Sequence, residues 1–147
     1  MTPQERATKS AKALWENDHA THWIGMELGP VTEAAATMVL SVKKHHCNGH
    51  AMCHGGIIFA LADSAFAFAC NSRNQVTVAQ HNNISFIAPG QVGDTLTATA
   101  SEVSLNGHSG IYDVRVTNQD GKTIAEMRGN SRAIKGQLFD ECNSDQG

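Results

Sequence analysis

One segment of the sequence, residues 55–72, has almost no polar side chains and restricts the folds open to this chain. It reads GGIIFALADSAFAFACNS, and its apolar run from Ile57 to Cys70 is interrupted only by Asp63 and Ser64. A helix that is apolar on every side must be buried. The run is also shorter than the roughly 20 residues that a membrane span needs. We therefore predict a long helix in the centre of the protein.

Extended segments follow this helix almost to the end of the chain. They cover residues 76–89, 94–103, 110–118 and 122–134. From Thr95 to Ala100, threonines alternate with apolar side chains, which is the period of a strand with one buried face. The pairs Asn106–Gly107 and Asp120–Gly121 are typical of turns between antiparallel strands. We predict an α+β fold in which an antiparallel sheet curves around the helix, because only a wrapped sheet buries all of its faces.

The N-terminus carries a helix start signal. Thr2 and Glu5 match a capping box, and Pro3 suits the first helical position. This pattern predicts a helix over residues 2–17. Residues 18–25 then suit a short helix or a turn.

Extended structure is predicted again before the central helix. Residues 26–33 contain a Gly-Pro turn signal, and residues 36–42 form a β-branched run, so the two segments suggest a first hairpin. At the other end, residues 136–147 have no periodicity and are expected to be flexible. We see no repeat, and residues 1–147 have the length of one domain.

Charge and composition exclude several classes of partner. The formal net charge is -3, which gives no broad basic surface for nucleic acid. Residues 1–18 are charged throughout, so we expect neither a secretory signal nor a membrane anchor. We predict a cytoplasmic protein with no nucleic-acid or membrane partner. Its four cysteines are then expected to be free thiols: Cys47, Cys53, Cys70 and Cys142.

Two glycines, Gly55 and Gly56, stand where the long helix begins and where a capping side chain is usual. Backbone N–H groups at a helix N-terminus carry partial positive charge, and a ligand oxygen can approach them when no side chain intervenes. Such a group can form an oxyanion hole. The alternative interpretation is a tight turn into the helix.

Asp63 is the one carboxylate within the apolar helix, and it has no basic residue four positions later. A buried charge without a partner costs several kcal/mol, so such a residue suggests a function. The alternative is a carboxylate satisfied by backbone N–H groups of a neighbouring strand. Gly55 and Asp63 are eight positions apart, about 12 Å along a helix. If both act on one carbonyl, the acid must come from a second copy in a symmetric dimer.

The loop before the helix contains six residues of metal-binding type, namely His45, His46, Cys47, His50, Cys53 and His54. Their spacing matches no standard zinc finger, deaminase or haem motif. We therefore expect loop structure or substrate contacts, and no metal. The sequence also lacks a G-x-S-x-G elbow, a P-loop and a dinucleotide fingerprint.

The segment from Asn48 to Ala65 spells NGHxxCHGGxxFxLADxA. It resembles the signature of the hotdog-fold thioesterases of the phenylacetate-degradation type, the phenylacetyl-CoA thioesterases. The likeness extends to residues 65–72, 86–100 and 111–129. The resemblance implies a hotdog fold, in which the sheet wraps the long helix, and an acyl-CoA thioesterase activity.

The resemblance also implies roles for individual residues. The backbone N–H of Gly55, assisted by Asn48, would polarise the thioester carbonyl, and His54 would position the loop or the thioester. Asp63 of a partner subunit would attack as a nucleophile or activate a water as a base. In some relatives a serine on the next strand orients that water, and Ala79 stands at the matching position here.

Further expectations from the resemblance concern the substrate and the assembly. The favoured substrate is an aryl- or arylacetyl-CoA, phenylacetyl-CoA or a ring-hydroxylated form, hydrolysed without a metal or organic cofactor because coenzyme A is part of the substrate. The family forms dimers that often pair into tetramers. The candidates for CoA binding lie on the hairpin 104–109 and on the last strand: Asn106, Gly107, His108, Arg128 and Arg132.

Two other functions remain open on the same fold. A non-catalytic protein that binds acyl-CoA or an aromatic ligand would keep Gly55 but would not need Asp63. A hydratase or dehydratase would use a catalytic histidine paired with an acid, and His54 could be assigned that role. Release of free thiol separates both from a thioesterase.

Overall fold

The computed structural model describes residues 1–141 and contains three α-helices, one short 3-10 helix and six strands. The helices are α1 (Pro3–Glu16), α2 (His19–Ile24) and α3 (Gly55–Cys70), with the 3-10 turn at Lys44–His46. The strands are β1 (Glu27–Thr32), β2 (Ala35–Ser41), β3 (Thr77–Phe86), β4 (Thr95–Asn106), β5 (Ser109–Thr117) and β6 (Thr123–Ala133). All six form one antiparallel sheet in the order β1-β2-β4-β5-β6-β3.

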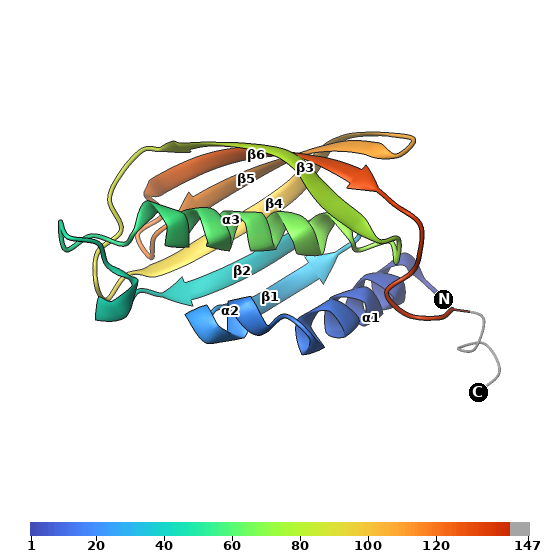
Figure 1. The fold of residues 1–147 in the computed structure, drawn as a ribbon, viewed down its shortest axis with the longest axis horizontal. Helices are drawn as coiled ribbons and strands as arrows, with labels where there is room; N and C mark the ends of the chain where they lie inside the picture. Colours follow the sequence, from blue (N-terminus) through green and yellow to red (C-terminus); the bar gives the residue numbers. More distant parts are fainter. Residues whose placement is uncertain (142–147) are drawn as a thin grey trace.

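The sheet curves around α3, with strands passing on both sides of the helix (Figure 1). Leu61, Ala65 and Phe66 of α3 are fully buried, and the apolar residues of β4 between Leu96 and Ala100 lie in the same core. The predicted central helix, the alternation in β4 and the α+β class are therefore confirmed. The hairpins β4–β5 and β5–β6 also form where the turn signals predicted them.

The N-terminal helix α1 follows its sequence signals. The Thr2 hydroxyl accepts a hydrogen bond from the Glu5 N–H at 3.1 Å, and the Glu5 carboxylate accepts one from the Thr2 N–H at 2.9 Å. Together they form the predicted capping box. Ala7 and Ala11 are buried on the face of α1 that meets the core, and α1 contacts β1.

The first hairpin forms, but its turn lies four residues later than the Gly-Pro signal suggested. Gly29 and Pro30 lie within β1, where the register shifts between Leu28 and Val31. An edge strand tolerates a proline, because the missing N–H removes no ladder bond on its open side. The chain reverses instead at Ala34, which has a φ of 67° and whose N–H donates to Ser72 Oγ at 2.7 Å.

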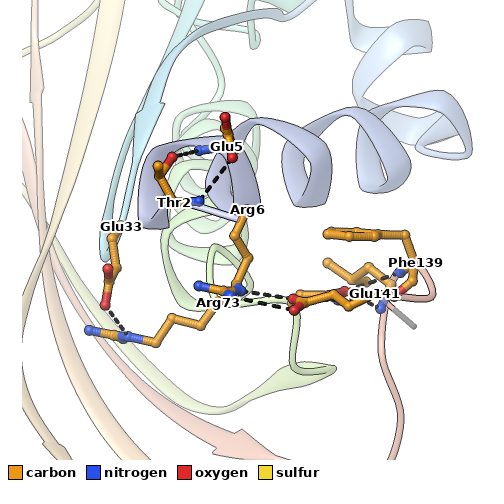
Figure 2. Close-up of polar contacts among 9 residues, drawn as sticks. Thr2, Glu5, Arg6, Glu33, Arg73, Phe139 and Glu141 are labelled. Carbon is orange, nitrogen blue, oxygen red and sulfur yellow. Dashed lines mark hydrogen bonds and ion pairs between the residues drawn. The ribbon is translucent and has the colours of Figure 1, made fainter. Parts of the chain in front are cut away.

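The C-terminal segment also differs from the prediction of a flexible tail that starts near residue 136. Asn74, which is buried, accepts hydrogen bonds from the N–H groups of Leu138 and Phe139 and donates one to Phe139 O. Glu141 forms an ion pair with Arg6 of α1 at 2.8 Å (Figure 2). The segment 138–141 is thus held by polar contacts that have no sequence periodicity, and the rest of the predicted tail, 142–147, lies outside the described residues.

Within residues 1–141, none of the helices combines the length and the hydrophobicity needed to cross a membrane. The longest, α3, has 16 residues, against the roughly 20 that a span requires.

Candidate functional site

The backbone at the start of α3 leaves one donor available. His54 is the N-cap, and its Nδ1 accepts a hydrogen bond from the Gly56 N–H at 2.8 Å. The N–H groups of Ile57 and Ile58 bond to the His54 carbonyl. Among the hydrogen bonds of residues 1–141, none uses the Gly55 N–H, so this donor is free at the positive end of the helix.

The cap on α3 corrects one part of the sequence interpretation. The glycine pair suggested a helix start with no capping side chain, but an imidazole ring takes that role. His54 therefore orders the loop and the first turn. Histidine is not among the common N-cap residues, and the sequence alone gave no reason to assign it there.

Gly55 is also closely packed, because the Phe86 ring at the end of β3 lies against it. A Cβ on residue 55 would lie 3.2 Å from Phe86 Cζ and 3.4 Å from a second ring carbon. Gly56 has its own close neighbour, since a Cβ there would lie 3.0 Å from His54 Nδ1. Both glycines therefore serve close packing as well as access to the backbone.

Asn48 is held by hydrogen bonds that leave its side-chain NH2 group free. Its side-chain oxygen accepts hydrogen bonds from the N–H groups of His50 at 2.9 Å and Met52 at 3.3 Å. Its own backbone N–H donates to Met52 O at 2.8 Å. These bonds leave the Asn48 Nδ2 group without a hydrogen bond within the described part of the chain, and this group is a second donor beside Gly55.

Asn48 and Gly55 share a cavity of about 350 Å³. The remaining lining residues are mostly apolar, and they come from the loop, from α3 and from the end of β3: Met52, Cys53, Ile58, Phe86, Ile87, Ala88 and Pro89. The cavity thus has two hydrogen-bond donors and an apolar wall. This arrangement suits a carbonyl oxygen attached to an apolar acyl group.

Asp63 lies elsewhere, two turns further along α3. It is half-buried, and its Oδ1 accepts a hydrogen bond of 2.6 Å from Asn82 Nδ2 on β3. The partner is therefore a side-chain amide, where backbone N–H groups were the alternative expected from the sequence. Asp63 is eight positions after Gly55, about 12 Å along the helix, so one chain does not bring the acid to the donors.

Sequence reasoning missed Asn82. Its signal was the run of polar residues at 80–83 inside an otherwise extended segment. Without the pairing of β3 with β6, this run does not show which side chain faces α3.

The candidates for CoA binding divide into two groups. Gly107, His108 and Arg132 line one pocket of about 470 Å³, together with Lys135 and other residues. Arg128 lies apart in an exposed bidentate pair with Asp113, at 2.7 and 2.9 Å. Asn106 is exposed at the end of β4, opposite Ser109, and does not line the pocket. Sequence reasoning missed Lys135, which lies beyond the last strand.

The histidines and cysteines of the loop are not arranged as ligands of one ion. His46 is buried, and its two ring nitrogens are used by the Lys43 N–H at 2.9 Å and by the Ile24 carbonyl at 2.7 Å. No group of three metal-binding side chains occurs among residues 1–141. Ala79 lies exposed on β3 and faces Ser131 of β6, next to a bulge at residue 80.

Comparisons with known proteins agree with this geometry. Residues 50–125 match the protein family described as the thioesterase superfamily. The chain is 41% identical to the acyl-coenzyme A thioesterase PaaI of Escherichia coli (strain K12), over 93% of this chain and 98% of that protein. The chain belongs to the thioesterase superfamily.

Solved structures of the superfamily show the same fold. The E. coli PaaI protein from the phenylacetic acid degradation operon superimposes with a TM-score of 0.91, at 40% identity and over 92% of this chain and 99% of that one. A variant of the phenylacetic acid degradation protein PaaI from Thermus thermophilus gives 0.75, at 31% identity and over 78% and 97% of the two chains. The expected hotdog fold and the resemblance to thioesterases of the phenylacetate-degradation type are thus confirmed, and the chain is a thioester hydrolase.

Proposed function

We propose that this protein hydrolyses aryl- or arylacetyl-CoA thioesters, with phenylacetyl-CoA or a ring-hydroxylated derivative favoured, to the free acid and coenzyme A. Membership of the superfamily and 41% identity to a named acyl-coenzyme A thioesterase support the reaction class. The observation that carries the proposal is the cavity in which the free Gly55 N–H and the Asn48 amide adjoin an apolar wall.

The wall of that cavity supports an aromatic acyl group. The Phe86 ring lies against Gly55, so an acyl group whose carbonyl meets the Gly55 N–H also meets this ring. Aromatic rings in contact contribute about 0.5–1.5 kcal/mol beyond the area that they bury. Ile58 and Ile87 complete the apolar side.

The reaction needs a carboxylate, which the proposal takes from a second subunit. The N–H of Gly55 and the amide of Asn48 stabilise the negative charge that develops on the carbonyl oxygen, while His54 fixes the helix start that presents them. Asp63 of the partner then attacks the carbonyl carbon or removes a proton from the attacking water, and CoA leaves as the thiolate. No metal or organic cofactor takes part in this scheme.

The shape of the chain supports an antiparallel dimer. Strand β3 is an edge of the sheet, and Val78, Phe86 and Ile87 on and beside it are apolar and exposed. A two-fold axis beside this edge would set two copies of α3 antiparallel, so that the Asp63 region of one meets the Gly55 region of the other. The proposed assembly is a homodimer at least, and a homotetramer as in the phenylacetate-degradation type.

The same two-fold symmetry suggests where the nucleotide part of CoA would bind. The β4–β5 hairpin lies at the end of the molecule where α3 ends, away from the start of α3 in the same chain (Figure 1). In an antiparallel dimer the partner's pocket at His108, Arg132 and Lys135 would lie nearer to Gly55 and would hold CoA phosphates. We place the enzyme in the cytoplasm, a reducing compartment that suits the free thiols of Cys47, Cys53 and Cys70.

The experiment is a thiol-release assay on a panel of phenylacetyl-, hydroxyphenylacetyl-, benzoyl- and straight-chain acyl-CoAs, with Asp63→Asn as the inactive control. The proposal predicts the highest kcat/KM on the arylacetyl thioesters and loss of most turnover in Asp63→Asn with the oligomer intact. Binding without thiol release would favour the non-catalytic function. Hydration of an enoyl-CoA without thiol release would favour the hydratase.

A further inference from the structure

The carboxylate of Asp63 has two oxygens in different environments. Oδ1 accepts the 2.6 Å hydrogen bond from Asn82 Nδ2. No other hydrogen bond or ion pair involves Asp63 within residues 1–141, so Oδ2 is free in the single chain. One oxygen is thus fixed and the other is available for chemistry.

Asn82 is itself held in a built position. It faces Gly129 in the pairing of β3 with β6. A Cβ on residue 129 would lie 3.0 Å from Asn82 Oδ1 and 2.9 Å from the Phe66 ring. Only a glycine at 129 leaves room for the amide between the two strands and the helix.

The oxygen atom of the Asn82 amide shows that hydrogen bonding alone does not explain where this side chain lies. Asn82 Oδ1 is buried and has no hydrogen-bond partner. A buried acceptor without a partner costs about 1–3 kcal/mol. A leucine would fill this space without that cost, so the asparagine is retained for what its Nδ2 group does.

We propose that Asn82 is a positioning residue for the thioesterase reaction, which holds the Asp63 carboxylate with Oδ1 fixed and Oδ2 presented for catalysis. This inference rests on the proposed catalytic role of Asp63. The hydrogen bond from Asn82 Nδ2 fixes Oδ1 relative to β3. Fixing one oxygen also limits rotation of the carboxylate about its χ2 angle.

The test compares Asn82→Leu, which keeps the volume, and Asn82→Asp, which keeps the shape but places a second acid beside the first. The matched control is Asn83→Leu at the neighbouring exposed position. For both variants at 82 we expect kcat to fall about 10- to 100-fold and KM to stay within about twofold, with the folded fraction measured by circular dichroism unchanged. Asn83→Leu should match the wild type.

The outcomes separate this inference from the proposed function. If Asp63→Asn is inactive while both variants at 82 keep the wild-type kcat, the positioning role is wrong and the role of Asp63 stands. A drop in kcat that matches a loss of folded protein would also overturn it, because a partly unfolded population lowers kcat alone. Full activity of Asp63→Asn would overturn the proposed function itself.

A second, independent observation concerns two thiols in the loop before α3. Cys47 and Cys53 face each other in an isolated antiparallel bridge. The flanking hydrogen bonds run from Asn48 N to Met52 O and from His54 N to His46 O, both at 2.8 Å. Cys47 and Cys53 therefore form a non-hydrogen-bonded pair, whose Cα atoms are typically about 4.5 Å apart, within the range of a disulfide.

We infer that Cys47 and Cys53 form a reversible disulfide when a peroxide is the oxidant. Cys47 is the more exposed of the two, and its sulfur attacks the peroxide oxygen to give a sulfenic acid and water. Cys53 then attacks that sulfur, and a second water leaves, so that two thiols and one hydrogen peroxide give one disulfide and two waters. Burial raises the pKa of Cys53 to about 11, so Cys47 and not Cys53 is the thiol that the peroxide oxidises first. The bond would lock the loop that carries Asn48.

The test uses a Cys142→Ser background, which leaves the three cysteines of the described chain. After hydrogen peroxide we expect a loss of about two mass units in the peptide that spans residues 47–53, reversed by dithiothreitol, with Cys70 still reduced. Cys47→Ser should abolish this change and Cys70→Ser should not. Oxidation of Cys47 to a sulfinic acid with Cys53 still free, or disulfides only between chains, would overturn the inference.

Discussion

The ring of Phe86 lies against the backbone of Gly55, with Cζ 3.2 Å from the position that a Cβ on residue 55 would occupy. The contact joins the end of β3 to the start of α3. It places an aromatic surface beside the free N–H that we assign to the oxyanion hole. The same contact therefore bears on both catalysis and choice of acyl group.

Gly55→Ala keeps the backbone N–H but should reduce kcat by up to about 100-fold, the effect of one oxyanion-hole donor that the carbonyl oxygen no longer reaches. The new methyl group would push the Phe86 ring or the helix start and would hinder access to the N–H. Steady-state thiol release measures the effect. Gly49→Ala is the control, because a Cβ there meets no atom within 4 Å. Equal activity of the two variants would contradict the assignment.

Phe86→Leu should change the acyl preference more than the rate on simple chains. Loss of the ring removes about 0.5–1.5 kcal/mol of aromatic contact, which corresponds to about 2- to 13-fold in kcat/KM. We expect that loss for phenylacetyl-CoA and little change for a straight-chain thioester. A uniform change across the panel would show that the ring does not contact the acyl group.

Arg132 and Arg128 should differ in their effect on the KM for acyl-CoA. Arg132 lines the pocket with His108 and Lys135, whereas Arg128 is engaged by Asp113. Loss of one charge-assisted hydrogen bond to a phosphate costs about 1.5 kcal/mol, so Arg132→Ala should raise KM about tenfold. Arg128→Ala should leave KM within about twofold. The opposite order would place the CoA phosphates on the middle of β6.

The free energy of unfolding should depend on pH through the carboxylate of Glu102. Hydrogen bonds from Arg73 hold the pKa of Glu102 below its usual value of 4.5, with a smaller contribution from the Tyr112 hydroxyl at 2.9 Å, while partial burial opposes the shift. A lowered pKa gives stability that is present above about pH 4.5 and is lost as the pH falls through the folded-state value.

Glu102→Gln should therefore lower the free energy of unfolding by about 1 kcal/mol at pH 7. The effect is small because solvent screens the partly exposed pair of Arg73 and Glu102. The difference from wild type should shrink near pH 3. Urea unfolding at pH 7 and near pH 3 measures the free energy of unfolding of the variant and the wild type. Glu33→Gln, which removes the exposed partner of Arg73, should have almost no effect at either pH. An equal loss for Glu102→Gln at both pH values would contradict the pKa shift.

Local and periodic features were predictable from the sequence. The apolar run of α3, the capping box of α1 and the Asn106–Gly107 turn each depend on residues close together in the chain, and each was found. The Gly-Pro signal misled because the same pair that suits a turn also suits a bulge on an edge strand.

Features set by distant segments were not predictable. The contact of Phe86 with Gly55 and the bond of Asn82 to Asp63 depend on β3 crossing beside α3, and β3 pairs with β6, which lies far along the sequence. Asn74 and the segment 138–141 meet only once the chain has folded. Arg128 pairs with Asp113 whereas Arg132 lines a pocket, and this difference likewise follows from where each side chain lies along β6 and what faces it there.

The most direct test of the central claim, that each active site takes Gly55 from one subunit and Asp63 from the other, is activity of mixed oligomers. Gly55→Ala and Asp63→Asn are each expected to be nearly inactive alone. Co-expressed in equal amounts, they should regain about a quarter of the wild-type kcat, because half of the dimers are mixed and each holds one intact site of two. A mixture as inactive as its parents, with mixed dimers confirmed by native mass spectrometry, would contradict the shared site.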